Sequence, residues 1–455
     1  MSYNILIEQA YDLHQYEELI LEFLRPEEYQ ITDDPAVAAD WDHVDIPVKD
    51  FGDHNQVKRM LYMFLAEITG KKPPWGILTG VRPVKLAGEM TDAYGEERAA
   101  GMLRSAYLLD DKKADLVQQI LKRQRHTFGR PGKESAGIYI GIPFCPSRCL
   151  YCSFASNQVG AEEIARYLPA LFKEMRASAE LLSARGYHAE SLYIGGGTPT
   201  SLTAEQLDEL LTLAEDCFGT ELWEETVEAG RPDTIDSEKL EVMAAHRVSR
   251  ISINPQTMHD ATLQRIGRNH TAADTLRAFE AARKAQIRDI NMDLIAGLPG
   301  ETEKDFEESL RQVIELEPEN ITIHCLAVKR ASRLRLVDEN YHYEHAGITA
   351  AMLSAAQAAM ATAGYEPYYL YRQKHMAGSL ENIGYTKGGC DSCYNVRIMD
   401  EHQTICAMGA GGMSKVYYPE ENRLERVPNV TNYEQYIDRI DEMIQRKKDN
   451  WNWRK

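Results

Sequence analysis

The chain has 455 residues, of which 44% are hydrophobic and 27% charged, and its formal net charge is -19. This length predicts two or three domains of an ordinary soluble protein, and the acidic balance argues against nucleic acid, whose phosphates need a basic surface. No apolar run reaches the roughly 20 residues of a membrane helix, and the N-terminus lacks secretory features, so we expect a cytoplasmic protein without a membrane span.

Residues 1–133 are predicted to form an N-terminal α+β domain whose role the sequence does not assign. It contains the strand-like NILI, the amphipathic DLHQYEELILEFL and a long helical pattern in EERAAGMLRSAYLLDDKKADLVQQILKRQR. The segment HTFGRPGKESAG, rich in glycine and small polar residues, is typical of a connection between domains. We therefore place the first domain boundary near residue 133.

Residues 134–365 show a different pattern, in which each short apolar run is followed by a turn and a helical pattern. The six runs are GIYIGI, SLYIGGG, ETVEAG, RISINPQ, DINMDLIAG and NITIHCLAV. Three of the following helices have the spacing of an N-cap and its partner, in the pairs Thr203 and Gln206, Thr271 and Asp274, and Thr302 and Asp305. Six βα units fit an open doubly wound sheet or an incomplete barrel, and in both the chemistry lies at the carboxyl ends of the strands.

Three cysteines, Cys145, Cys149 and Cys152, follow the first apolar run in a C-x3-C-x2-C pattern. A reducing compartment keeps thiols free, so a metal cluster is favoured over a disulfide framework. Three thiolates in one loop suit a four-iron four-sulfur cluster in which one iron has no protein ligand. Two alternatives, a structural zinc site and an electron-transfer ferredoxin, would each normally need a fourth ligand.

Cys145, Cys149, Tyr151 and Cys152 resemble the signature of radical S-adenosylmethionine (SAM) enzymes, whose open iron binds SAM. YIGIPFCPSRCLYCSF, YIGGGTPT, SINPQTMHDATLQRIGRNHT and INMDLIAGLPGETEKDFEESL resemble blocks of the oxygen-independent coproporphyrinogen III oxidase (dehydrogenase) family. The likeness spans roughly residues 137–420 and is closest to the HemZ branch. It implies one [4Fe-4S] cluster and SAM as cofactors. It also implies an incomplete (β/α)6 radical SAM barrel over 134–365, with a C-terminal extension, 366–455, completing the substrate site.

The glycine-rich turn GGGTPT follows the second run. Its backbone N–H groups at Gly196, Gly197 and Thr198 are unhindered by side chains and are expected to hold the methionine part of SAM. A tight turn before the capped helix is the alternative.

Polar residues also stand at the ends of later strands or inside them. Asp293 lies in an otherwise apolar run, where an unpaired carboxylate would be costly, so it should have partners. The resemblance assigns SAM contacts to Glu228, Gln256, Arg268 and Asp293. It places Ala327 at the same pocket, together with Tyr139 as the catalytic candidate. The alternative is that these polar groups satisfy one another inside the barrel.

The loop LAVKRASRLR after the sixth run contains Lys329, Arg330, Arg333 and Arg335. Arginine binds carboxylates through two parallel hydrogen bonds, and coproporphyrinogen III bears four propionates. We therefore predict that Arg330 and Arg333 bind the substrate, with a solvated basic surface as the alternative.

Cys390 and Cys393, with Cys406 downstream, could ligate a second cluster or be ordinary thiols, and binding of a second SAM is likewise left open. Gly409, Gly411 and Gly412 predict a close backbone approach to another strand or to the substrate, and the resemblance favours the substrate.

The resemblance implies that a 5'-deoxyadenosyl radical removes hydrogen from the β-carbon of a propionate. Loss of carbon dioxide and one electron then leaves a vinyl group. Two such steps convert coproporphyrinogen III to protoporphyrinogen IX, and we expect an electron donor such as flavodoxin or ferredoxin, which the sequence does not identify. The chain departs from the family at Gly141, where a histidine is usual, at Phe154, where a fourth cysteine is usual, and at Glu381 and Thr386. The rival functions are a haem-binding chaperone and a radical SAM enzyme acting on another tetrapyrrole.

Overall fold

The structure is a computed structural model that describes residues 2–10, 12–50, 52–154, 156–329, 331–338, 340–373 and 376–451. All six predicted strands form, and they pair in parallel in chain order. These strands are β4 (Ser135–Ile142), β5 (His188–Gly196), β6 (Glu224–Glu228), β7 (Arg250–Ser252), β8 (Asp289–Ala296) and β9 (Asn320–Cys325).

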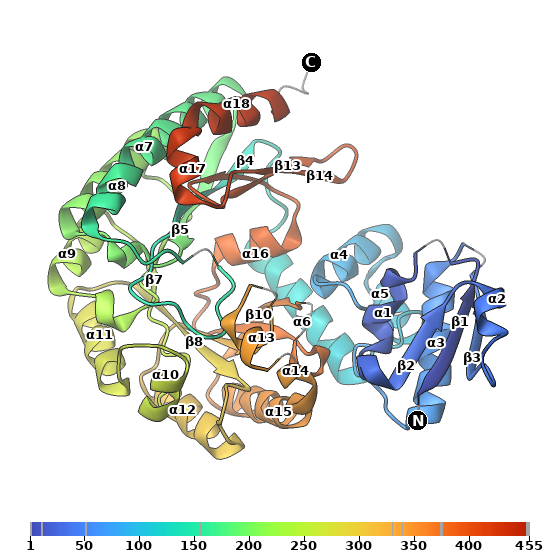
Figure 1. The fold of residues 1–455 in the computed structure, drawn as a ribbon. Helices are drawn as coiled ribbons and strands as arrows, with labels where there is room; N and C mark the ends of the chain where they lie inside the picture. The colour runs from blue at the N-terminus through green and yellow to red at the C-terminus, as the bar shows by residue number, and fades with distance from the viewer. Residues whose placement is uncertain are drawn as a thin grey trace.

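Helices cover the outer side of this curved sheet (Figure 1). They are α7 (Ala161–Ala184), α8 (Ala204–Phe218), α9 (Ser237–Ala245), α10 (Asp260–Arg265), α11 (Ala272–Lys284), α12 (Glu303–Glu315) and α15 (Ala346–Thr362). Thr203, Thr271 and Thr302 cap α8, α11 and α12 through the predicted reciprocal hydrogen bonds. These caps satisfy backbone donors that would otherwise have no partner at the helix start.

The segment after residue 365 extends the sheet at both edges. β10 (Glu366–Tyr371) and β11 (Asn382–Thr386) join it through β9, whereas β12 (Thr404–Met408), β13 (Met413–Tyr418) and β14 (Arg423–Pro428) join it through β4. Between the two groups runs α16 (Cys393–Asp400), and α17 (Tyr433–Asp438) and α18 (Ile440–Asn450) end the described chain. The resulting eleven-stranded mixed sheet has β10 and β14 as its outer strands. It is therefore open, and the predicted incomplete barrel is confirmed.

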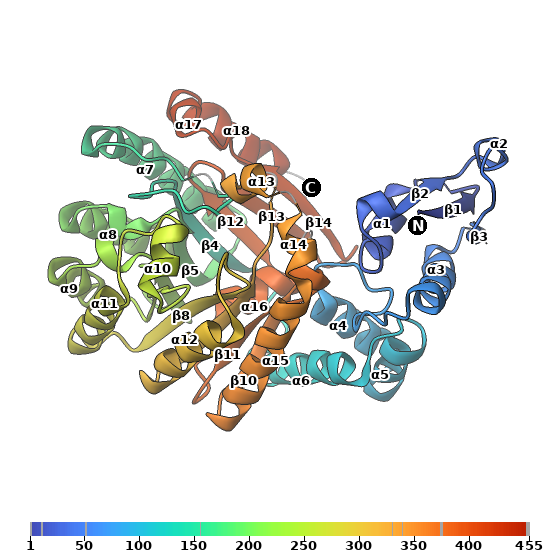
Figure 2. The same cartoon turned by 60° about the horizontal axis from the view of Figure 1, so that its bottom comes forward.

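The N-terminal residues form a smaller unit at one side of the main body (Figures 1 and 2). Its strands β1 (Tyr3–Glu8), β2 (Tyr29–Thr32) and β3 (Ile46–Lys49) pair in parallel, and α1 (His14–Ile20), α2 (Pro35–Ala38) and α3 (His54–Thr69) accompany them. Ile5, Leu19 and Leu61 share its separate hydrophobic core.

The next three helices belong to the larger core, because Val84, Leu103 and Ile120 pack with the residues of the main sheet. These helices are α4 (Pro83–Tyr94), α5 (Glu96–Ser105) and α6 (Asp111–Thr127). The domain boundary near residue 133 stays a prediction, although α6 ends and β4 begins on either side of it.

The long helical pattern predicted before residue 126 is divided into α5 and α6. The backbone N–H of Ile77 donates to the carbonyl oxygen of Tyr107 at 2.9 Å, and Leu108 has a positive φ of 59°. A Cβ on Gly76 would lie 2.1 Å from that same oxygen. This tertiary contact bends the chain between the helices, which periodicity alone does not reveal.

Within the described ranges, we find no helix that combines the length and the apolar character needed to cross a bilayer.

Candidate functional site

A cavity of about 390 Å³ opens at the carboxyl ends of β5–β9. Its wall contains eleven of the fourteen residues that the sequence predicted for the site. They are Cys145, Cys149, Cys152, Gly196, Gly197, Thr198, Glu228, Gln256, Arg268, Asp293 and Ala327. The parallel strands bring these residues together because their carboxyl ends meet at one edge of the sheet.

The cysteine loop, residues 143–154, is held against the strand ends by polar contacts. The hydroxyl of Thr198 lies 3.5 Å from Cys145 Sγ, and Arg231 Nη1 lies 3.8 Å from Cys149 Sγ. Arg231 also donates through Nη2 to Ser147 Oγ at 2.9 Å. Sequence reasoning missed Arg231, although a cation directly after a strand, at the same edge as the cysteines, was the available signal.

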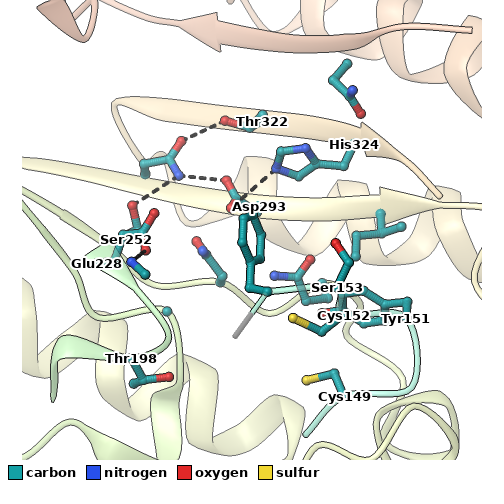
Figure 3. Close-up of a pocket in the computed structure, with 18 of the residues that line it drawn as sticks. Cys149, Tyr151, Cys152, Ser153, Thr198, Glu228, Ser252, Asp293, Thr322 and His324 are labelled. Carbon is teal, nitrogen blue, oxygen red and sulfur yellow. Dashed lines mark hydrogen bonds and ion pairs between the residues drawn. The ribbon is translucent and has the colours of Figure 1, made fainter. Parts of the chain in front are cut away.

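The thiols suit a cluster better than a single ion. Among the described residues, no three His, Cys, Asp or Glu side chains converge on one metal ion. A four-iron four-sulfur cubane is larger than a single ion, and each of its thiolate ligands binds a different iron. Three separated thiols on one cavity wall can therefore bind such a cluster. Figure 3 shows the sulfur atoms of Cys149 and Cys152 on the same side of the cavity. Burial raises the pKa of the Cys152 thiol to about 11, so iron would supply the positive charge that stabilises the thiolates.

The glycine-rich turn differs from the expectation in one respect. The N–H groups of Gly197 and Thr198 donate to the carbonyl oxygens of Ile142 and Phe144, both at 2.7 Å, and that of Gly196 donates to Glu228 at 3.2 Å. All three predicted donors are therefore occupied within the protein. A Cβ on Gly197 would lie 2.4 Å from the Phe144 oxygen, so glycine is needed here for close strand packing.

Glu228 lies at the end of β6 and accepts a hydrogen bond of 2.5 Å from the hydroxyl of Tyr193. Burial, with a smaller contribution from the charge of Asp293, raises the pKa of Glu228 to about 7. This carboxyl group can therefore be neutral or charged near neutral pH.

Asp293 in β8 has one partner in its own strand and one in the neighbouring strand β9 (Figure 3). Asn291 Nδ2 donates to it at 2.7 Å, and His324 Nε2 lies 3.4 Å from its other oxygen. Burial alone would raise the pKa of Asp293, but these contacts outweigh it and hold the pKa below its ordinary value. The second ring nitrogen of His324 lies 3.2 Å from the hydroxyl of Tyr371 in β10. Asp293 therefore has the partners that its apolar surroundings require.

Gln256 and Arg268 complete the polar side of the cavity. Gln256 has a positive φ of 68°, and its buried Oε1 has no hydrogen-bond partner in the described structure. A strained backbone and an unpaired buried acceptor at the same residue indicate that the Gln256 side chain binds a ligand. Arg268 donates to the carbonyl oxygens of Asn254 at 2.6 Å and Gly230 at 2.7 Å, so it also connects the segments that follow β6 and β7.

Tyr139 lies behind the cavity wall. Its ring stacks on Tyr193 and Tyr394, with centroids 6.2 and 6.3 Å away. Its catalytic role stays a prediction. Arg333 is exposed on α13 (Arg333–Val337), and Arg330 lies outside the described residues. Among the described basic residues of this loop, Lys329 lines the cavity.

Comparison with known proteins places this site in a family. Residues 139–313 match the family described as Radical SAM superfamily. The oxygen-independent coproporphyrinogen-III oxidase-like protein HemZ of Bacillus subtilis (strain 168) is 39% identical over 86% of this chain and 80% of its own length. The chain belongs to the radical SAM superfamily and to this oxidase-like family.

Two further relatives bear on the function of this radical SAM protein. Heme chaperone HemW of Bacillus subtilis is 37% identical over 42% of this chain and 50% of its own length. The solved coproporphyrinogen III oxidase HemN of Escherichia coli, described as a radical SAM enzyme, matches with a TM-score of 0.53. It is 21% identical over 69% of this chain and 70% of its own, which shows a shared fold. The predicted family, fold and cofactors, SAM and one [4Fe-4S] cluster, are confirmed.

Two departures of this radical SAM protein from its wider family have structural explanations. A Cβ on Gly141 would lie 3.2 Å from the carbonyl oxygen of Met408, and one on Gly409 would lie 2.4 Å from that of Gly141. Gly409 in the glycine-rich segment after β12 thus approaches a strand, which was one of the two expectations, and substrate contact stays a prediction. Glu381 is fully buried away from the cavity, where it accepts from Trp75 Nε1 at 2.9 Å and pairs with Lys113.

The remaining thiols of the radical SAM protein lie in different elements. Cys393 begins α16, and its N–H donates to Glu224 at 2.9 Å. Cys406 is buried within β12, opposite Ile138 of β4. Among the described residues, Cys390, Cys393 and Cys406 do not converge on one metal ion.

We expect Glu228→Gln to make the cluster-free protein more stable at alkaline pH. The raised pKa means that, between about pH 4.5 and 7, folded Glu228 holds a proton that the unfolded chain releases, so stability falls as pH rises through this window. Relative to the parent, the free energy of unfolding of the variant should be higher by up to about 3 kcal/mol above pH 7 and unchanged near pH 4.5. Melting temperatures of parent and variant from pH 5 to 8 measure this gain, and a difference that does not change with pH would contradict it.

Proposed function

We propose that this protein catalyses the oxygen-independent oxidative decarboxylation of two propionates of coproporphyrinogen III, giving the vinyl groups of protoporphyrinogen IX. The observation that carries the proposal is that a single cavity joins the cysteine loop of a radical SAM site to an aromatic wall from the C-terminal segment. Tyr368, Tyr369 and Tyr371 of β10 line it opposite the strands of the barrel. Aromatic faces with polar tips suit a large, partly apolar tetrapyrrole that carries carboxylates.

The chemistry requires removal of one hydrogen atom from a carbon that has no acidic proton. When bound, the cluster and SAM supply a 5'-deoxyadenosyl radical for this step. The substrate then loses carbon dioxide from its carboxylate and one electron to a one-electron acceptor, and a carbon–carbon double bond remains. The residues of this chain position the reactants and exclude water, because no side chain needs to gain or lose a proton in this sequence.

The polar residues divide between the two small molecules. Gln256, Asp293 and Glu228 at the strand ends bind SAM, and Gln256 offers it the unpaired acceptor. Lys329 lines the same cavity as the β10 tyrosines and binds a substrate propionate. Burial lowers the pKa of the Lys329 ammonium, and a substrate carboxylate beside it would favour its charged state.

A haem-binding chaperone is the second candidate, because one observation favours it. Phe154 replaces the fourth cysteine, lines the cavity, and leaves 70% of its side chain exposed. An exposed aromatic ring at a cavity mouth suits an apolar macrocycle that is bound and then released.

The deciding experiment is anaerobic. The reconstituted protein is mixed with dithionite, SAM and coproporphyrinogen III, and 5'-deoxyadenosine and porphyrin products are quantified by chromatography and mass spectrometry. We expect a monovinyl product that is lighter than the substrate by one carbon dioxide and two hydrogen atoms, and a divinyl product that is lighter by two carbon dioxides and four hydrogen atoms. An intact porphyrinogen, together with tight binding of added haem, would overturn the proposal in favour of the chaperone.

A further inference from the structure

A buried arginine faces the cysteine loop from a neighbouring segment. Arg231 lies just after β6 and lines the cavity, yet only 3% of its surface is exposed. Its Nη1 lies 3.8 Å from Cys149 Sγ and donates to the carbonyl oxygen of Ser147 at 3.4 Å. Burying a charged group is costly unless the group is paired, so the position of this guanidinium requires an explanation.

A carboxylate occupies the other edge of the same guanidinium. Arg231 donates through Nε to Asp233 Oδ1 and through Nη2 to Asp233 Oδ2, both at 3.1 Å. The buried His270 places its Nδ1 3.7 Å from Asp233 Oδ1. Burial alone would raise the pKa of Asp233, but His270 and Arg231 outweigh it and hold the pKa well below its ordinary value. Asp233 is therefore ionised at neutral pH, and its two hydrogen bonds leave Nη1 of Arg231 for the sulfur.

Arg231 has a mechanical role as well. Its Nη2 donates to Ser147 Oγ at 2.9 Å, and that hydroxyl donates to the carbonyl oxygen of Gly267 at 2.9 Å. These contacts fix Ser147, which lies between Cys145 and Cys149 in the loop. A neutral amide side chain could donate to the same oxygens without the cost of burying a charge. The presence of a cation here therefore points to a role for the charge itself.

We propose that Arg231 raises the reduction potential of the bound cluster through Cys149, and that Asp233 is the positioning residue that holds Arg231 there. When a [4Fe-4S] cluster takes up one electron from a reductant, its total charge becomes one unit more negative. A cation beside a ligand sulfur therefore stabilises the reduced state more than the oxidised state, and a hydrogen bond to that sulfur acts in the same direction. The inference depends on the cluster alone, and not on which substrate the protein takes.

The test measures the midpoint potential of the reconstituted full chain without SAM or coproporphyrinogen III. An anaerobic titration with dithionite and redox mediators is followed by cluster absorbance and by the electron paramagnetic resonance signal of the reduced cluster. Arg231→Met removes the cation, and Asp233→Asn removes its counter-charge while keeping the side-chain shape. Arg277→Met is the matched control, because Arg277 is exposed on α11 and pairs there with Asp274.

We expect Arg231→Met to lower the midpoint potential by about 59 mV or more, which is a tenfold change in the one-electron equilibrium. Asp233→Asn should raise the potential, because the cation beside Cys149 then loses a compensating negative charge. The control should keep the potential of the parent. If Arg231 only anchors the loop, the two variants will shift the potential in the same direction or not at all, and either result would overturn the proposal.

Iron content shows whether each variant holds a full cluster. If Arg231→Met does not retain about four iron atoms per chain, Asp233→Asn decides alone. A raised potential in that variant supports the proposal, whereas an equal or lower one refutes it. Because no SAM is cleaved in these titrations, an unchanged potential leaves the proposed function standing. A lack of vinyl products in the turnover experiment would equally leave the role of Arg231 untouched.

Discussion

Replacing Cys149 with alanine is expected to remove the cluster and with it all SAM cleavage. The thiol of Cys149 is buried in the cavity wall and lies 3.8 Å from Arg231 Nη1. With two thiolates remaining, a second iron of the cubane would lack a protein ligand. Iron content should therefore fall from about four atoms per chain to below one. SAM cleavage under dithionite should drop at least about a hundredfold, because removal of a ligand to a metal centre eliminates the species that carries the electron.

The measurements are iron content, absorbance near the cluster band and 5'-deoxyadenosine formation. Cys217→Ala is the matched control, since this thiol lies near the end of α8 and is partly buried outside the cavity. The control should keep its iron and its activity. Cleavage of SAM at the parental rate by the Cys149 variant would contradict the assignment of the cluster ligands.

Replacing Glu174 with glutamine is expected to cause the largest loss of stability. This carboxylate in α7 is fully buried and pairs with Lys447 of α18, which is also buried. It further accepts hydrogen bonds from Tyr436 at 2.5 Å, Gly409 N–H at 2.8 Å and Asn429 at 2.8 Å. The variant leaves a buried ammonium without its counter-charge, which costs about 3 to 5 kcal/mol.

The thermal midpoint of the variant should fall by several degrees. The double variant Glu174→Gln/Lys447→Met should recover more than half of that loss, because it removes the unpaired charge and keeps the volume. Lys173→Met is a control on the same helix, where the lysine is exposed and pairs at the surface with Asp441. A double variant no more stable than the single one would show that the hydrogen bonds to Glu174, rather than the charge pair, fix the C-terminal helices.

This cluster has a functional consequence as well. The N–H of Gly409 donates to the Glu174 carboxylate, and Gly409 packs against Gly141. Gly141 lies in β4, close before the cysteine loop. Tyr167 reinforces the contact, since its hydroxyl donates to the Gly141 oxygen at 2.7 Å. We therefore expect the single Glu174 variant to lose its cluster faster than the parent on dilution or mild heating.

The sequence by itself determined the elements whose signals are local. The spacing of Cys145, Cys149 and Cys152 indicated a three-ligand cluster, because ligand number follows from residue type within one short loop. Six apolar runs predicted six parallel strands, and three N-cap pairs fixed helix starts, since capping depends on residues one turn apart. The carboxyl ends of parallel strands meet at one edge, so Glu228 at the end of β6 and Asp293 within β8 were expected close together, and both line the cavity.

Only the tertiary structure decided which groups the cavity leaves available. The N–H groups of the glycine-rich turn were expected to bind SAM, but those of Gly197 and Thr198 donate to carbonyl oxygens of β4 and the loop after it, and that of Gly196 donates to the carboxylate of Glu228. The partnership of Asp293 with His324, and the approach of Arg231 to Cys149, likewise join separate strands. Hydrogen bonds between elements depend on packing distances that no local sequence pattern encodes. The sequence therefore identified the candidate site residues, and only the tertiary structure showed their hydrogen-bond partners.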